Sequence, residues 1–272
     1  MWKNLSKEEL DRAYNNSLAV PNSSELTQNW ADNSLELRGC LAGELNIPYG
    51  KATRQCYDYF SAGNDSPIAV FIHGGFWQSR SKDSFTFIVP PLLEQGISIA
   101  LLGYRLAPEV NMNEIVLDIR NGLNAIQSKV RGERKNFPGF CLLGWSAGAH
   151  LAASVMDQPN VNTAVGVSGI YDLEPICYCY VNNLLQLDSE MAKKYSPILH
   201  ATHFDKPLDL VVGDDELSEM QKQTVDFFKY RNSKNQAGNF ILLNGLNHFT
   251  ILDELLRKDS QILKLVKEST KR

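Results

Sequence analysis

Short apolar runs alternate along the chain with longer stretches in which apolar residues recur at a helical period. The runs are rich in β-branched residues and hold few polar positions, which is typical of strands covered on both faces of a sheet. Such strands are expected at residues 68–72, 97–102, 140–143, 164–167, 208–212 and 240–243. The helical stretches between them cover residues 84–95, 114–130, 147–156, 183–194 and 219–230.

Strands that alternate with helices predict βαβ units and a mostly parallel central sheet with helices on both faces. The β-rich stretch 44–60 is broken by Pro-Tyr-Gly at residues 48–50, so we expect an antiparallel hairpin at one edge. Residues 1–40 are expected to form an N-terminal helical segment that packs near the site entrance. Because repeats and linker-like stretches are absent from the sequence, residues 1–272 are expected to form a single α/β domain with a small helical or loop cap.

Composition narrows the class of protein. The 272 residues are 43% hydrophobic and 21% charged, as in ordinary soluble globular domains. A formal net charge of −4 offers no basic field to attract nucleic acid, and the sequence has no apolar run long enough to span a membrane. The first residues predict no secretion signal. The 5 cysteines follow no disulfide or zinc spacing, so we expect a cytoplasmic protein without a metal or other cofactor.

The clearest chemical signal is the sequence Gly-Trp-Ser-Ala-Gly at residues 144–148. It follows a predicted strand and opens a predicted helix, which is the context of a G-x-S-x-G nucleophile elbow. Small residues on both sides of Ser146 allow the sharp turn that holds its hydroxyl clear of the sheet. We therefore predict Ser146 as a nucleophile, and the alternative is a tight strand-to-helix turn with a capping serine.

A second motif, His-Gly-Gly-Phe-Trp, directly follows the first core strand. Two consecutive glycines let backbone N–H groups turn into a pocket, where they can stabilise the oxyanion of a tetrahedral intermediate. The expected donors are the amides of Gly75, Phe76 and Ala147. His73 is expected to hold the shape of this loop, whereas Trp77 either lines a substrate pocket or packs in the core.

A nucleophilic serine needs a general base and a carboxylate that orients the base, and in this fold both follow the serine in the chain. His248 comes after the last core strand and is the candidate base. Asp214, Asp215 and Glu216 come after the preceding strand. Only one carboxylate is expected to face the imidazole, because like charges resist being buried together. The spacing leaves open which one it is.

Together these residues resemble the kynurenine formamidase (arylformamidase) family of the α/β-hydrolase superfamily. The sequence at residues 73–77 is similar to the family's oxyanion loop, which is more specific than the H-G-G-G of general esterases. One departure is Ser17, because relatives often carry a basic residue after the asparagines. The resemblance extends along most of the chain, with similar segments at residues 10–16, 20–21, 48–50, 54–55, 58, 104–109, 144–150, 168–175 and 196–197.

The resemblance implies an α/β-hydrolase fold and a role for the position at residue 216. The segment from Glu216 onward is similar to the family segment whose first position carries the triad acid, and many relatives have Asp there. Glu216 is therefore the favoured acid, and Asp215 is the alternative. The segment between the fifth strand and the acid is expected to supply the wall of the substrate pocket, through Tyr171, Tyr178, Tyr180 and Asn182.

The implied reaction cleaves the formyl amide of an N-formyl arylamine such as N-formyl-L-kynurenine. Ser146 attacks, His248 transfers the proton, and water releases formate from the acyl-enzyme. The expected partner is a small aromatic formamide or ester, with no nucleic acid and no membrane, and a homodimer is the assembly considered. A carboxylesterase acting on small acyl esters would use the same residues and stays open, as does an inactive hydrolase fold kept for binding.

Overall fold

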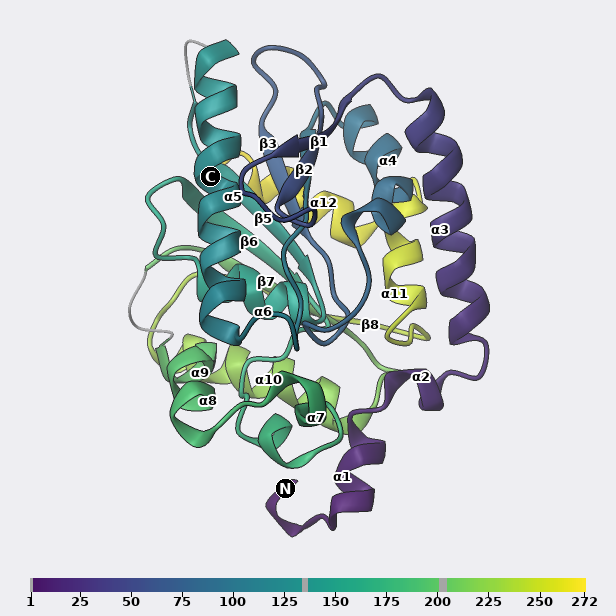
Figure 1. Ribbon diagram of the computed structural model, residues 1–272, viewed down its shortest axis with the longest axis vertical. Helices are drawn as coiled ribbons and strands as arrows, with labels where there is room; N and C mark the ends of the chain where they lie inside the picture. Colours follow the sequence, from purple (N-terminus) through teal and green to yellow (C-terminus); the bar gives the residue numbers. More distant parts are fainter. Residues whose placement is uncertain (1, 134–136, 201–204) are drawn as a thin grey trace.

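The computed structural model describes residues 2–133, 137–200 and 205–272. At its centre lies an eight-stranded sheet in the order β1-β2-β4-β3-β5-β6-β7-β8 (Figure 1). β2 pairs antiparallel with both of its neighbours, and the strands from β4 to β8 pair in parallel. The strands are β1 (Glu44–Pro48), β2 (Cys56–Phe60), β3 (Ile68–Ile72), β4 (Ser98–Leu102), β5 (Phe140–Trp145), β6 (Val161–Val167), β7 (Leu208–Gly213) and β8 (Phe240–Leu243).

Helices cover both faces of the sheet (Figure 1). Residues of α5, α6 and α10 pack on one face, and residues of α3, α4, α11 and α12 pack on the other. A group of short helices between β6 and β7 forms a cap. The helices are η1 (Trp2–Asn4), α1 (Lys7–Ala13), α2 (Asn16–Ala19), α3 (Ser23–Cys40), η2 (Lys82–Ile88), α4 (Val89–Glu94), α5 (Met112–Glu133), α6 (Ala147–Ser154), η3 (Pro175–Tyr178), α7 (Asn182–Leu185), α8 (Ser189–Tyr195), α9 (Pro197–His200), α10 (Ser218–Ser233), α11 (Thr250–Asp253), η5 (Glu254–Leu256) and α12 (Gln261–Ser269).

The strand β3 shows why the apolar runs become central strands. Its alternate residues belong to different clusters: Ile68, Val70 and Ile72 pack with α5 and α6, whereas Ala69 and Phe71 pack with the helices of the other face. All five positions of β3 are buried, which requires a continuous apolar run rather than an alternating one. The mostly parallel sheet, its six predicted core strands and the antiparallel edge hairpin are confirmed.

Two local expectations are wrong. The predicted helix at 183–194 is divided into α7 and α8 because Gln186 adopts a left-handed conformation with φ 52°. Asp188 then caps the start of α8 through the amide of Met191. The strand β8 was expected to be covered on both faces, but it lies at the edge of the sheet and Leu242 is 45% exposed.

Buried polar contacts hold the N-terminal helix α3 against the domain. The carboxylate of Asp58 on β2 is fully buried and pairs with Arg38 of α3 and with Lys82, whose Nζ lies 2.7 Å away. The indole N–H of Trp30, also on α3, donates to Asp253 Oδ1 at 3.0 Å. The N-terminal segment is therefore anchored through groups that lie far away in the sequence.

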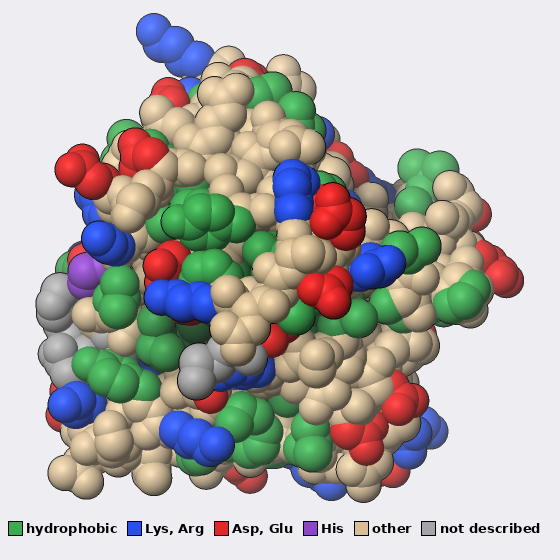
Figure 2. All heavy atoms as spheres, turned by 90° about the horizontal axis from the view of Figure 1, so that it is seen from below, with side chains coloured by type: hydrophobic (Ala, Val, Ile, Leu, Met, Phe, Trp, Pro, Cys, Tyr) green, Lys and Arg blue, Asp and Glu red, His purple; other side chains and the backbone are tan. Residues whose placement is uncertain are grey.

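The surface carries mixed charge on the face seen from below, where hydrophobic side chains are interspersed with both acidic and basic ones (Figure 2). This agrees with the slight negative net charge of −4. Within the described ranges, none of the helices has the length and apolar character needed to cross a bilayer.

Candidate active site

The turn between β5 and α6 holds Ser146 in a strained conformation. Its φ of 56° and ψ of −120° are unusual for a residue with a side chain, and its N–H donates to Val167 O at 2.8 Å. Glycine is required on both sides. A Cβ at Gly144 would lie 2.3 Å from the carbonyl oxygen of Gly148, and one at Gly148 would lie 1.9 Å from that of Ile72. This geometry is that of a nucleophile elbow.

A chain of hydrogen bonds leads away from the Ser146 hydroxyl. His248 Nε2 lies 3.0 Å from Ser146 Oγ, and His248 Nδ1 lies 2.7 Å from Glu216 Oε2. The other carboxylate oxygen, Glu216 Oε1, accepts from the N–H of Gly213 at 2.9 Å and from the Ser168 hydroxyl at 2.6 Å. All three members of the chain are buried. The arrangement has the connectivity of a serine–histidine–acid triad.

Only one of the three adjacent acids faces the imidazole. Asp214 and Asp215 are both exposed, and Asp214 Oδ1 accepts from the N–H of Gly245 at 2.6 Å. Glu216 turns inward under β7, where its carboxylate is fully enclosed. The geometry therefore favours Glu216 over Asp215 as the partner of His248.

The loop after β3 places free backbone donors beside Ser146. Gly75, Phe76 and Trp77 have φ values of 114°, 49° and 60°, so the backbone turns through three consecutive left-handed residues. Within the described part of the chain, the amides of Gly75, Phe76 and Ala147 meet no hydrogen-bond acceptor. These are the donors that the sequence predicted. Amides held in this way are available to an oxyanion.

Ser146 opens into a cavity of about 300 Å³. Aromatic rings form much of its wall, and Arg80 is the one lining residue of the described chain with a permanent charge. The Arg80 guanidinium lies over the rings of Trp145 and Phe249, with Cζ at 5.5 and 5.9 Å from the ring centroids. The lining residues are Asn16, Ser17, Gly75, Phe76, Gln78, Ser79, Arg80, Trp145, Ser146, Tyr180, Leu184, His248 and Phe249.

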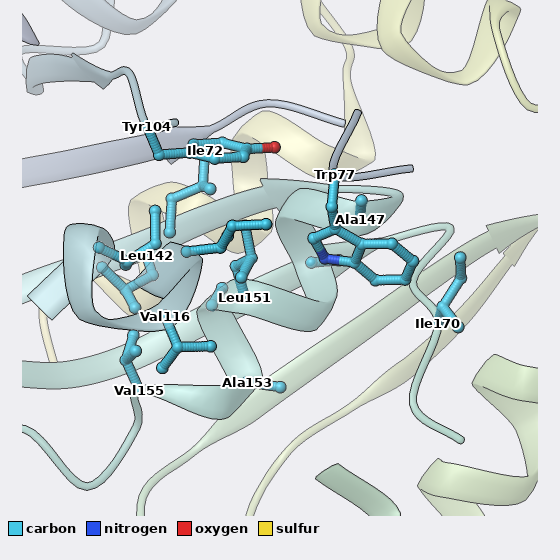
Figure 3. Close-up of a cluster of buried hydrophobic side chains, with 14 of the residues drawn as sticks. Ile72, Trp77, Tyr104, Val116, Leu142, Ala147, Leu151, Ala153, Val155 and Ile170 are labelled. Carbon is cyan, nitrogen blue, oxygen red and sulfur yellow. The ribbon is translucent and has the colours of Figure 1, made fainter. Parts of the chain in front are cut away.

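Trp77 does not line this cavity, contrary to one of the two expectations for it. It is fully buried, and its indole N–H donates to His150 Nδ1 at 3.1 Å. Figure 3 shows its ring among the buried hydrophobic side chains around α6 and Ile170. Trp77 is therefore part of the core under the oxyanion loop.

Most of the predicted pocket wall is also placed elsewhere. Tyr171 is fully buried and stacks on Phe227, with ring centroids 4.4 Å apart. The Asn182 side chain bonds to the backbone of its own loop, including the N–H of Leu187 at 2.6 Å. Tyr178 is 56% exposed, and it does not line the cavity. Tyr180 alone of the four predicted wall residues does so.

Sequence reasoning found the lining only in part. It expected the N-terminal segment near the site entrance and marked Ser17 as a departure from the family, and Asn16 and Ser17 of α2 line the cavity. Ser168, whose hydroxyl donates to Glu216, begins the family-like segment at residues 168–175, but no role for it was predicted. Arg80 is a single cation shortly after the oxyanion loop, and that position was the one available signal.

The eight-stranded sheet, the elbow and the hydrogen-bonded trio define a hydrolase of the α/β-hydrolase class. The same fold is found in a solved structure described as a thioesterase from Silicibacter sp. The two share a TM-score of 0.85 at 24% sequence identity, over 95% of this chain and 98% of the other.

The chain belongs to the kynurenine formamidase family. It is 30% identical over 293 residues to the kynurenine formamidase of Danio rerio, covering 97% of each chain. It is 29% identical over 291 residues to that of Salmo salar, again covering 97% of each. The BD-FAE family model matches residues 57–166, the part that holds the oxyanion loop and the elbow.

Proposed function

We propose that this protein hydrolyses the formyl amide of an N-formyl arylamine such as N-formyl-L-kynurenine, releasing formate and the free amine. The observation that carries the proposal is the hydrogen-bonded chain from Ser146 through His248 to Glu216 at the end of an aromatic-lined cavity. Membership of the kynurenine formamidase family supports the choice of a formamide.

In the first half of the reaction, His248 Nε2 accepts the Ser146 proton as the serine oxygen attacks the formyl carbon. The amides of Gly75, Phe76 and Ala147 donate to the carbonyl oxygen as it becomes negative. His248 then gives its proton to the amine nitrogen, and the C–N bond breaks. The free amine leaves, and a formyl ester remains on the serine.

In the second half, water takes the place of the amine. His248 accepts a proton from the water as its oxygen attacks the formyl ester, and the protonated imidazole returns that proton to Ser146 Oγ as formic acid leaves and ionises to formate in the solvent. Glu216 accepts a hydrogen bond from His248 Nδ1–H throughout, which fixes the tautomer and stabilises the imidazolium.

The dimensions of the cavity suit such a substrate. A formyl group carries only hydrogen on its carbonyl carbon, so the acyl side needs little room. The volume of about 300 Å³ lies at the small end for ligand pockets and is adequate for one aromatic ring with a short chain. The rings of Phe76 and Tyr180, which line the cavity and are partly exposed, supply faces for that aromatic group.

The test is the turnover of N-formyl-L-kynurenine beside p-nitrophenyl acetate by the wild type and by Ser146→Ala. A higher kcat/KM for the formamide, lost in the variant, supports the proposal. If the ester turns over well and the formamide does not, the same machinery belongs to a carboxylesterase and the proposal is wrong.

We further propose that residues 1–272 act as one domain, that the protein works in the cytoplasm and that it forms a homodimer. All five cysteine thiols are unpaired, which supports a reducing compartment. Sedimentation velocity tests the homodimer, and fractionation of cells that express a tagged chain tests the location.

A further inference from the structure

The cavity beside Ser146 contains a cation that the proposed chemistry does not use. Arg80 forms no ion pair with any carboxylate in the described ranges. Its guanidinium lies on two aromatic faces, those of Trp145 and Phe249. Burial lowers the pKa of Arg80, but a guanidinium stays protonated at neutral pH. A partly desolvated charge without a partner is costly, so an anion is the natural complement.

The backbone holds Arg80 at this position. Its φ of 72° lies in the left-handed region, which is unusual for a residue with a side chain. The carbonyl of Arg80 accepts a hydrogen bond from Arg54 Nη1 at 2.8 Å. Backbone conformations of this kind cost energy and are concentrated at functional sites. The strain and the unpaired charge thus occur at one residue of the cavity wall.

A second, independent feature of the same cavity is Asn16. Its side chain is only 4% exposed, and within the described chain neither amide atom, Oδ1 nor Nδ2, has a hydrogen-bond partner. Buried polar groups are normally paired, because an unsatisfied amide loses its bonds to water. Asn16 lines the same cavity as Arg80, and its unpaired amide carries one acceptor and one donor group.

We propose that Arg80 and Asn16 bind the charged amino-acid end of an aryl formamide whose formyl group lies at Ser146. The proposal rests on the proposed function. The planar guanidinium matches a carboxylate in a two-point contact. The amide of Asn16 can donate to the carboxylate through Nδ2 and accept from the ammonium group through Oδ1.

The spacing of the two ends agrees with such a molecule. Both groups lie close to the ring of Trp145, with Arg80 Cζ at 5.5 Å and the imidazole centroid of His248 at 5.2 Å from the ring centroid. The guanidinium and the imidazole are therefore both neighbours of one aromatic side chain. An aryl ring with a short side chain that ends in a carboxylate could reach from one group to the other, so Arg80 would select formamides that carry a carboxylate over formamides that do not.

The main test compares Arg80→Gln and Arg80→Lys with the wild type on N-formyl-L-kynurenine and on uncharged formanilide. Arg80→Gln is expected to lower kcat/KM for N-formyl-L-kynurenine on the order of 10- to 100-fold, mainly through KM. The kcat/KM of Arg80→Lys for N-formyl-L-kynurenine should lie between those of the wild type and Arg80→Gln, because lysine keeps the charge but loses the planar contact. The kcat/KM for formanilide should fall much less than the kcat/KM for N-formyl-L-kynurenine. Lys258→Gln, which removes an exposed charge outside the cavity, is the matched control.

Asn16→Leu tests the second group. The side chains are similar in size, and the amide atoms have no partner to lose among the described residues. The thermal midpoint should therefore stay the same or rise, while kcat/KM for N-formyl-L-kynurenine falls and formanilide turnover does not. A lower midpoint with equal losses on both substrates would mean a structural role only.

The Arg80 assignment is wrong if Arg80→Gln leaves both substrates unchanged, or if it lowers both equally, since the residue would then act through Trp145. If the wild type hydrolyses neither formamide, the proposed function fails, and 4-acetoxybenzoate and phenyl acetate replace the two substrates. A selective loss on acetoxybenzoate in Arg80→Gln would then support the carboxylate site, and equal losses would overturn it.

Discussion

Replacing Glu216 by glutamine should inactivate the protein through the tautomer of one histidine. Glu216 Oε1 accepts from the backbone N–H of Gly213 at 2.9 Å, and that group can only donate. A glutamine must therefore keep its carbonyl oxygen on this side. Its NH2 group then faces His248 Nδ1, where Glu216 Oε2 lies at 2.7 Å. The imidazole must accept at Nδ1, so its proton moves to Nε2 and it no longer accepts the proton of Ser146.

The size of the loss in kcat depends on the other orientation that the glutamine side chain can adopt. If the glutamine turns its NH2 group toward Gly213, two buried donors face each other, which costs about 1–3 kcal/mol. That cost alone lowers the rate roughly 5- to 150-fold. The variant also loses the negative charge beside the imidazolium. A matching acid-to-amide change in a serine protease triad lowers kcat about 10⁴-fold. We expect kcat for N-formyl-L-kynurenine to fall about 10³- to 10⁴-fold.

The assay is steady-state kinetics of Glu216→Gln and Asp215→Asn, with thermal denaturation to show that both are folded. Asp215 is exposed and does not contact the imidazole, so its variant should keep kcat within about twofold of the wild type, as surface changes normally do. The reasoning is refuted if Glu216→Gln stays within about tenfold of the wild type. A fall in Asp215→Asn as large as that expected for Glu216→Gln would refute it as well.

Three further changes test other parts of the molecule. Ser146→Ala and Ser146→Gly should both lose turnover. The glycine variant should be the more stable by about 1 kcal/mol in chemical denaturation, because glycine adopts φ 56° without strain. Equal stabilities of the two variants would argue against strain at the elbow. Gly148→Ala would place a Cβ 1.9 Å from Ile72 O and should destabilise the fold by about 4 kcal/mol or more. Gly132 has open space around it, so Gly132→Ala should stabilise α5 by about 0.4–1 kcal/mol. Similar urea midpoints for the two variants would contradict this contrast. Burial lowers the pKa of His150 to about 4 from 6.5. Between these two pH values the unfolded chain binds a proton that the folded chain does not bind. The free energy of unfolding therefore falls by about 1.4 kcal/mol per pH unit as the pH decreases through this range. His150→Gln, which can keep both hydrogen bonds of the ring, should show a shallower fall of the free energy of unfolding between pH 6.5 and 4.5, and an unchanged slope would refute the assignment.

The parts of the fold that the sequence predicted correctly obey local rules. The buried run before Ser146, the small residues around it and the apolar helix after it determine β5, the elbow and α6 within fifteen positions, from residue 140 to 154. The division of the predicted helix at Gln186 was missed, because its left-handed conformation depends on how the cap packs. Propensity alone does not favour a break there.

The residues that we propose as catalytic were easier to predict than the walls of the cavity. Ser146, Glu216 and His248 follow strand ends, and parallel strands bring such positions together at one edge of the sheet. Trp77 and Tyr171 are aromatic residues close to the motifs, but only tertiary packing decides whether such a ring faces the core or the pocket. Here both face the core.

The difference between the sheet-bound residues and the cavity wall affects how the site can change. The proposed triad is fixed by the sheet, whereas the cavity wall is assembled from α2, the loop after β3 and the cap. The carboxylate of Asp11 on α1 accepts the N–H of Tyr180 at 2.6 Å, so the N-terminal segment and the cap hold each other in place. Substitutions in this wall alter groups that we propose contact the distant end of a substrate, and they should act mainly on KM. Substitutions in the triad remove interactions made in the transition state and should act on kcat. A family with this architecture can therefore change its substrate without rebuilding its chemistry.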